Sequence, residues 1–151
     1  MGQLIDLYNS IKDEVDGKKK FASMVCQIAP YFSTIQPQLI ELRYGYSEWS
    51  MKKRREVENH LSTVHAIAVC NLCEISAGLC MEASIPDDKR WIPKGLNISY
   101  LKKTKTDLRA VCTLGDVSWE DVEDLDLEVE VFDLDNDVVA KATVPMRVGD
   151  K

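Results

Sequence analysis

One carboxylate stands alone in the most apolar stretch of the chain. Glu74 is the only charged residue between Asn59 and Met81. The run from Ala66 to Met81 is apolar on nearly every side of a helix, which predicts a buried helix. A carboxylate in such surroundings is costly unless it is paired, hydrogen-bonded or protonated, and carboxylates placed in this way are typical general acids or bases. We therefore take Glu74 as the first candidate catalytic residue.

The alternative for Glu74 is a structural role. Its carboxylate would then accept hydrogen bonds from Asn71, Ser76 or backbone groups and would do no chemistry. The residue by itself leaves both interpretations open.

Two cysteines in the same run, Cys70 and Cys73, have the spacing of a C-x-x-C motif. A structural zinc site commonly needs four ligands, and no second pair completes one, since the only histidines are His60 and His65. A redox motif is expected at a helix N-terminus after a strand rather than in the middle of a helix. We therefore predict apolar packing for these thiols and no metal site.

The composition is typical of a soluble globular protein. The chain has 151 residues, of which 45% are hydrophobic and 29% charged, enough for one domain with a substantial core. The net charge of −6 argues against broad contact with nucleic acid. Basic residues gather at 18–20, 52–55 and 89–109. We interpret these clusters as solvated surface, with binding of an anionic ligand group as the alternative.

The sequence has neither a membrane-spanning pattern nor a secretion signal. Its apolar run carries Asn71, Glu74 and Ser76 and is shorter than the roughly 18 residues that a membrane span needs. The first residues lack the basic-then-apolar order of a signal peptide. The five cysteines, an odd number, indicate free thiols in a reducing compartment. We predict a cytoplasmic protein.

Hydrophobic periodicity predicts two short helices, two strands, the long apolar helix and four further strands, in that order. Ser62 or Thr63 is expected to cap the long helix. Ile28 is expected on the apolar stripe of the second helix, and Ile98 and Tyr100 on one face of the third strand. The predicted helices are residues 3–15, 18–29 and 64–83, and the predicted strands are 33–46, 46–53, 92–102, 108–115, 125–134 and 138–148.

This order predicts an α+β fold. A helix that is apolar all round must be wrapped, and a curved antiparallel sheet of about six strands can wrap it. The outer side of such a helix also suits an interface with a second copy. We expect one domain over residues 1–151, with residues 1–30 as an N-terminal helical extension.

The residues around Glu74 resemble a known signature. Residues 59–66 read Asn-His-Leu-Ser-Thr-Val-His-Ala, and Glu74 follows Asn59 by 74 − 59 = 15 positions. This resembles the hotdog-fold thioesterases related to phenylacetyl-CoA thioesterase, whose signature is Asn-x-x-Gly-Thr-x-His-Gly-Gly and then Asp or Glu on the central helix. The chain looks most like a bacterial family labelled as a domain of unknown function in that superfamily. The resemblance covers roughly residues 21–148 and implies a hotdog fold.

The resemblance also implies an activity, the hydrolysis of an acyl-CoA or acyl-carrier-protein thioester. Glu74 would activate a water molecule, and the Ala66 N–H at the helix N-terminus would polarise the thioester carbonyl. Asn59 would orient the water or the substrate, and His65 would brace the loop or join the network. Coenzyme A would enter as part of the substrate, with no separate cofactor.

The same resemblance implies that the site forms across a homodimer, alone or within a tetramer of two dimers. The asparagine would come from one chain and the carboxylate from the other. Thr63, Ala66 and Ile67 are the expected substrate-binding residues. The basic residues from Lys102 to Arg109, or those at 52–55, would neutralise the phosphates of a coenzyme A tail.

Three positions depart from the signature. Ser62 stands where it has glycine, and Ala66 and Ile67 stand where it has two glycines. The Ala66 methyl group crowds the approach to its own N–H, and Ile67 narrows the site further. These departures favour the alternative function, a non-catalytic hotdog protein that binds acyl groups or only self-associates. A dehydratase of the same fold is a weaker alternative, because those enzymes usually place a catalytic histidine beside the carboxylate in a different loop order.

Overall fold

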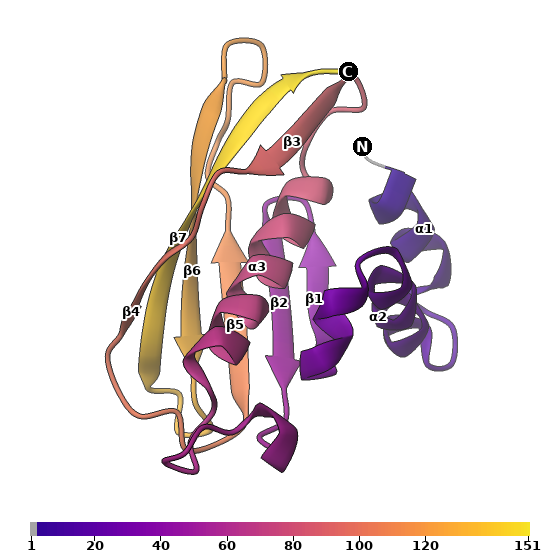
Figure 1. The fold of residues 1–151 in the computed structure, drawn as a ribbon. Helices are drawn as coiled ribbons and strands as arrows, with labels where there is room; N and C mark the ends of the chain where they lie inside the picture. The colour runs from indigo at the N-terminus through magenta and orange to yellow at the C-terminus, as the bar shows by residue number, and fades with distance from the viewer. Residues whose placement is uncertain (1–2) are drawn as a thin grey trace.

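The computed structural model describes residues 3–151 and contains three α-helices, two 3-10 helices and seven strands in that part of the chain (Figure 1). The helices are α1 (Gln3–Ile11), α2 (Gly17–Ile28), η1 (Pro30–Ile35), η2 (Arg55–Val57) and α3 (Ala66–Glu82). The strands are β1 (Gln38–Arg43), β2 (Tyr46–Met51), β3 (Lys89–Pro93), β4 (Asn97–Tyr100), β5 (Leu108–Thr113), β6 (Asp124–Phe132) and β7 (Val138–Asp150).

All seven strands form one antiparallel sheet with the order β1-β2-β5-β6-β7-β3, and β4 also pairs with β7. The sheet curves around α3, which packs against β2, β5, β6 and β7 (Figure 1). This arrangement confirms the predicted α+β hotdog fold. Its physical basis is the alternation of the strands: in β6, Leu127, Val129 and Val131 are buried, while the alternating residues Asp126 and Glu128 are exposed.

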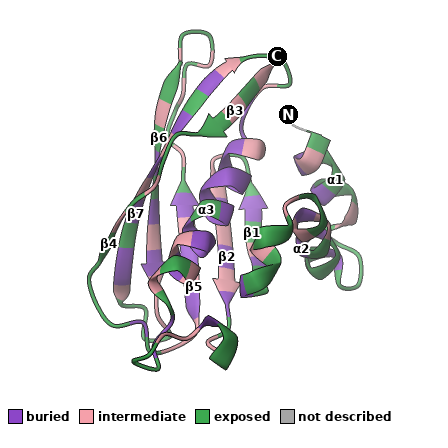
Figure 2. Ribbon diagram, in the orientation of Figure 1, coloured by how far each residue is buried: buried purple, intermediate pink, exposed green. Residues whose placement is uncertain are grey.

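The long helix is covered on most of its circumference but not on all of it. Leu72, Cys73 and Ile75 are fully buried. Ile67 is 55% exposed, and Glu74 is exposed as well. These two residues are seven positions apart and lie on one stripe of the helix, which carries exposed and half-buried residues in Figure 2. The prediction that Glu74 is buried is therefore wrong for the single chain, because the sheet wraps α3 from one side only.

The N-terminal helices pack beside the sheet at its β1 edge (Figure 1). Tyr8 of α1 and Phe21 of α2 are buried against each other, with ring centroids 5.0 Å apart. Lys18 donates from Nζ to the carbonyl oxygen of Ile40, 2.5 Å away, at a bulge in β1. A lysine on a free strand edge discourages pairing with another chain. Ile28 was expected on the buried stripe of α2 but is 73% exposed, because β1 and η1 cover only the opposite side of that helix.

The first strand begins later than predicted. Residues 33–35 belong to η1 rather than to a strand, because Pro30 sets the backbone for a helical turn and the hydroxyls of Ser33 and Thr34 donate to the carbonyl oxygens of Pro30 and Tyr31. Such local bonds compete with a strand ladder.

The predicted strand 92–102 is two strands. Both β3 and β4 pair with β7, and residues 94–96 interrupt them. Gly95 lies in this break, and a glycine weakens a strand because it has no side chain to pack. No helix in residues 3–151 combines the length and the apolarity that a membrane crossing requires.

Replacing Ile75 with alanine should destabilise the protein by about 2–5 kcal/mol, because the change leaves a cavity between α3 and the sheet. The matched control is Ile28→Ala, at an exposed position of α2, where we expect the free energy of unfolding to change by less than about 0.5 kcal/mol. Urea unfolding followed by circular dichroism measures both. Equal losses in the two variants would contradict the burial pattern described above.

Candidate functional site

The loop before α3 is closed by the side chain of Asn59. Its Oδ1 accepts from the backbone N–H groups of Leu61, at 2.9 Å, and of Thr63, at 3.2 Å. Its Nδ2 donates to Thr63 Oγ1 at 2.9 Å. Ser62 in this loop has a φ of 56°, a left-handed conformation in which glycine would be less strained. The amide of Asn59 therefore holds its own loop in shape.

The N-cap of α3 is His65, not Ser62 or Thr63. The Ile67 N–H donates to His65 Nδ1 at 3.0 Å, and the His65 N–H donates to the carbonyl oxygen of Val57 at 2.7 Å. The predicted caps are displaced because Asn59 engages Thr63 inside the loop. His65 thus caps the start of the helix with its side chain.

The next backbone donor, the N–H of Ala66, makes no hydrogen bond to any of residues 3–151. Free N–H groups in the first turn carry the positive end of the helix dipole. Ala66 lines a hollow of about 370 Å³ together with Asn59, Thr63 and residues 100–104. The structure therefore brings three predicted site residues together around an unused helix N-terminus.

The other wall of this hollow was not predicted as part of the site. Tyr100 donates from its hydroxyl to the carbonyl oxygen of Ala66 at 2.9 Å, and Cys70 Sγ lies 3.3 Å from the same hydroxyl. Partial burial, together with the Cys70 contact, raises the pKa of Tyr100, so the hydroxyl stays protonated at neutral pH and can donate. Only the placement of Tyr100 with Ile98 on one face of a strand hinted at this contact.

Glu74 lies at a second hollow, of about 340 Å³, which Pro93, Leu96 and Val144 also line. On either side of this hollow the edge strand is attached to α3. Trp91 of β3 lies against Gly78 and donates from Nε1 to Glu82 Oε2 at 2.9 Å. On the other side, the Tyr100 hydroxyl reaches the first turn of α3. The break at residues 94–96 lies between these two attachments, and Glu74 is exposed there.

No salt bridge joins Glu74 to another residue in the described range 3–151. The two side chains named as donors in the structural alternative for Glu74 make their hydrogen bonds elsewhere. Asn71 donates to Tyr31 O and Thr34 Oγ1 of η1, and Ser76 donates to Ala110 O of β5.

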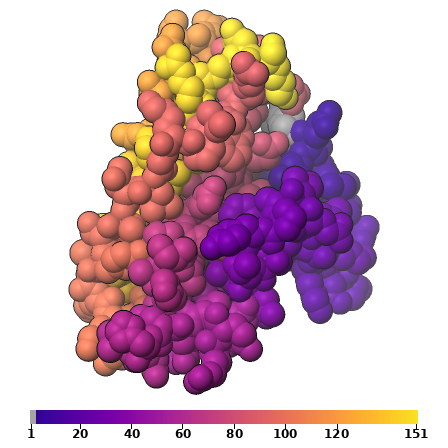
Figure 3. Space-filling view, viewed as in Figure 1, coloured from indigo at the N-terminus to yellow at the C-terminus, as the bar shows by residue number. Residues whose placement is uncertain are grey.

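Within one chain the two hollows are separate. Glu74 follows Ala66 by eight residues, which corresponds to about 12 Å along the helix axis. Asn59 and Glu74 therefore line different depressions of the same chain. Figure 3 shows the outer surface of α3 between the edge strand and the N-terminal helices.

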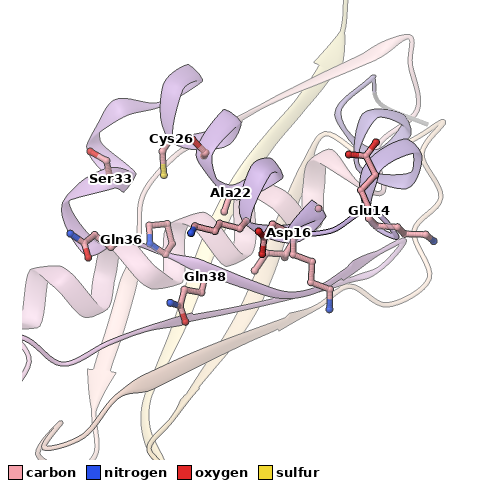
Figure 4. A pocket seen from close by; sticks show the side chains of 14 residues that line it. Glu14, Asp16, Ala22, Cys26, Ser33, Gln36 and Gln38 are labelled. Atoms are coloured by element: carbon pink, nitrogen blue, oxygen red, sulfur yellow. The ribbon is translucent and has the colours of Figure 1, made fainter.

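A larger hollow, of about 750 Å³, lies between α2 and β1 and contains none of the predicted site residues (Figure 4). It is lined by polar and charged side chains, among them Glu14, Asp16 and Gln38, and also by apolar ones such as Ala22 and Leu39. The size of this hollow does not by itself indicate a chemical function, and the candidate catalytic residues lie around α3.

Cys73 is buried and packs in the core, whereas Cys70 is only half-buried and lies 3.3 Å from the Tyr100 hydroxyl. Burial raises the pKa of the Cys73 thiol to about 12, so it remains protonated at neutral pH and is a poor nucleophile or metal ligand. No group of three or more potential metal ligands is present in residues 3–151.

Most cations of the predicted basic clusters are already paired. Lys102 lies 2.9 Å from Asp137, Arg109 3.1 Å from Glu48, and Lys52 3.0 Å from Asp107. Lys103, which lines the hollow at Ala66, makes no salt bridge within the described part of the chain. Among the basic residues from 102 to 109, Lys103 is therefore the unpaired cation best placed at that hollow.

Residues 17–148 match a family model with the description Domain of unknown function (DUF4442). No curated protein matches the chain significantly. Among solved structures, a structural-genomics target is 39% identical, covering 98% of this chain and 99% of its own, with a TM-score of 0.86.

Two more distant structures share the fold. A Pseudomonas aeruginosa protein described as a probable thioesterase is 19% identical, covering 88% of this chain and 96% of its own, with a TM-score of 0.78. A thioesterase from Haemophilus influenzae is 12% identical, covering 83% of this chain and 88% of its own, with a TM-score of 0.73. At these identities the likeness establishes the fold alone.

Replacing His65 with alanine should destabilise the protein by about 1 kcal/mol, because the Ile67 N–H loses its acceptor. His65→Asn should restore most of this loss, since asparagine is a good N-cap. His60→Ala, at the exposed loop histidine, serves as the control and should change stability by less than about 0.5 kcal/mol. Guanidinium unfolding measures all three, and an Asn variant as unstable as the Ala variant would argue against the cap.

Proposed function

We propose that this chain, which belongs to the DUF4442 family and has a hotdog fold, hydrolyses an acyl thioester carried by coenzyme A or by a carrier protein. The observation that carries this proposal is the position of Glu74. It is a charged side chain on an apolar helix, and it is exposed where the edge strand is interrupted. Its carboxylate makes no hydrogen bond or ion pair within residues 3–151, so it is free to act on a substrate.

In the proposed reaction Glu74 takes a proton from a water molecule as the water attacks the thioester carbonyl carbon. The carbonyl oxygen becomes an oxyanion, which the free N–H of Ala66 stabilises at the positive end of the helix dipole. The carbon–sulfur bond then breaks, and the proton on Glu74 passes to the leaving thiolate. Pro93, Leu96 and Val144 give the hollow beside the carboxylate an apolar wall, and Lys94 and Gly95 complete its lining.

The remaining predicted residues act around these two groups. The side chain of Asn59 is held by Leu61 and Thr63, so we assign it the shaping of the loop that lines the hollow rather than direct proton transfer. His65 fixes the first turn of α3. Ala66 lines the hollow at the helix N-terminus, and the side chain of the next residue, Ile67, is 55% exposed. We assign to both residues a limit on the size of the acyl group.

A second copy of the chain completes this site. The hollow at Ala66 and the hollow at Glu74 are separate within one chain, so one substrate can reach both groups only if they come from different chains. The exposed stripe of α3 and the unpaired side of β3 and β4 offer the surface for this contact. Exposed Ile67 and Ile92 lie on these segments, and exposed Leu101 directly follows β4, as expected for an interface.

Lys103 supports a substrate with a phosphate-bearing carrier arm. It lines the hollow at Ala66 and is the only lysine or arginine there without an ion-pair partner in residues 3–151. The thioesterase descriptions of the P. aeruginosa and H. influenzae structures agree with this class of substrate.

A non-catalytic protein that binds acyl groups is the second candidate. The observation that favours it is the crowding at the helix N-terminus, where the Ala66 methyl group and the 55% exposed Ile67 side chain stand in place of two glycines. Such a protein would retain acyl groups without turnover.

Glu74→Gln should lower kcat for thioester hydrolysis at least about a hundredfold, because the amide cannot accept the proton of the attacking water. The measurement is thiol release from a panel of short, medium and aromatic acyl-CoA esters, followed with a thiol-trapping dye. Glu82→Gln on the same helix is the matched control, since its amide oxygen can still accept from Trp91, and it should retain wild-type rates. Equal rates for wild type and Glu74→Gln on every ester would remove Glu74 from the mechanism.

The protein should sediment as a dimer, and its activity per chain should fall on dilution in parallel with the dimer fraction, because each site needs two chains. Analytical ultracentrifugation and the thioester assay over the same concentrations test this. A monomer with undiminished activity would show that one chain suffices.

A further inference from the structure

The segment from Tyr100 to Thr104 is attached to the start of α3 at two places. Thr104 exchanges two hydrogen bonds with Val64: the Val64 N–H donates to the Thr104 carbonyl oxygen at 2.8 Å, and Thr104 Oγ1 donates to the Val64 carbonyl oxygen at 2.9 Å. Tyr100 donates to the carbonyl oxygen of Ala66 at 2.9 Å. The attachments therefore bracket the peptide that carries the free N–H of Ala66.

The two attachments differ in exposure. Thr104 is buried, so its bonds to Val64 are part of the folded framework. Tyr100 is 46% exposed, and its hydroxyl is the only side-chain donor from residues 3–151 to the first turn of the helix at Ala66. First turns fray readily, because their N–H groups have no partners within the helix.

The hydroxyl of Tyr100 is the donor in one of its two contacts and the acceptor in the other. Its single proton is donated to the Ala66 carbonyl oxygen, so the Cys70 thiol must be the donor in the contact between Cys70 Sγ and Tyr100 at 3.3 Å. A chain of bonds thus runs from Cys70 through Tyr100 to Ala66 and ties one turn of α3 to strand β4.

We propose that Tyr100 is a positioning residue for thioester hydrolysis, which holds the first turn of α3 so that the Ala66 N–H points steadily at the carbonyl oxygen. This inference rests on the proposed function. Tyr100 itself donates its proton to Ala66 and transfers none to the substrate. It acts on the reaction indirectly: by holding the Ala66 carbonyl group, it fixes the orientation of the Ala66 N–H on the adjacent peptide unit.

A donor to an oxyanion contributes more in the transition state than to the bound substrate. Loosening that donor should therefore lower kcat and leave KM nearly unchanged. A residue that only supported the fold would instead lower the amount of active protein and the melting temperature, in proportion to each other.

The test is Tyr100→Phe, which removes the hydroxyl and keeps the ring. We expect kcat for the best acyl-CoA ester to fall about tenfold, as displacement of a catalytic group does, with KM within a factor of about two of wild type. The matched control is Tyr44→Phe, whose hydroxyl accepts only from Trp119 in the described chain, and whose rate should equal that of wild type. Melting temperatures of both variants, and hydrogen exchange of the first-turn amides of α3, accompany the kinetics.

The outcomes separate the two ideas. If wild type hydrolyses esters and Tyr100→Phe keeps the wild-type kcat, the positioning role is wrong while the proposed function stands. A loss of kcat that active-site titration attributes entirely to unfolded protein also overturns it. If wild type releases no thiol from any ester, the proposed function fails, and the inference fails with it. Faster exchange in the first turn of Tyr100→Phe, together with the fall in kcat, supports it.

Discussion

The structure depends on the need to cover a helix that is apolar on nearly every side. Burial of such a helix is the largest favourable contribution that this sequence can make to folding. The curved sheet covers the side that carries Leu72 and Ile75. Separate segments contact the rest of the helix: η1 contacts Asn71, Trp91 packs against Gly78, and Tyr100 is hydrogen-bonded to the first turn.

The candidate site lies where this cover is incomplete. The edge strand touches α3 at Trp91 and at Tyr100, and between them it is interrupted above Glu74. At the start of the helix the loop closed by Asn59 leaves the Ala66 N–H without a partner among residues 3–151. A carboxylate and an electropositive helix end are thus both accessible on the uncovered side of α3. The same incomplete cover accounts for the apolar side chains that remain exposed beside them, and it is the basis of the proposed association with a second chain.

The N-terminal helices have a different part in this arrangement. They lie at the β1 edge, where Lys18 donates a hydrogen bond to a backbone carbonyl group. The edge formed by β3 and β4 has no such cover within residues 3–151. One end of the sheet is protected against association and the other is available for it. The hollow between α2 and β1 is larger than the two at α3, but it lies on the protected side.

The sequence alone determined the fold, because its information lies in periodicity. The alternation in β6 and β7 and the continuous apolar run of α3 each follow from the geometry of one element. Local bonding overrode periodicity in two places: residues 33–35 formed η1 because Ser33 and Thr34 bond to preceding carbonyl groups, and His65 became the cap because Thr63 was already engaged by Asn59. The residues Asn59, Thr63 and Ala66 were singled out by their resemblance to the thioesterase signature, and the fold places them around one hollow.

Only the tertiary structure decided the exposure of Glu74 and the part played by Tyr100. The composition of a helix states how apolar it is but not which of its faces a neighbour covers, because that depends on the path of segments distant in sequence. Residues 94–96 interrupt the edge strand above Glu74, and Tyr100 reaches back over 34 positions to Ala66. Contacts of this kind leave no periodic trace in the sequence, so the chain by itself fixed which residues could do chemistry, and the packing of the edge strand decided which of them are free to do it.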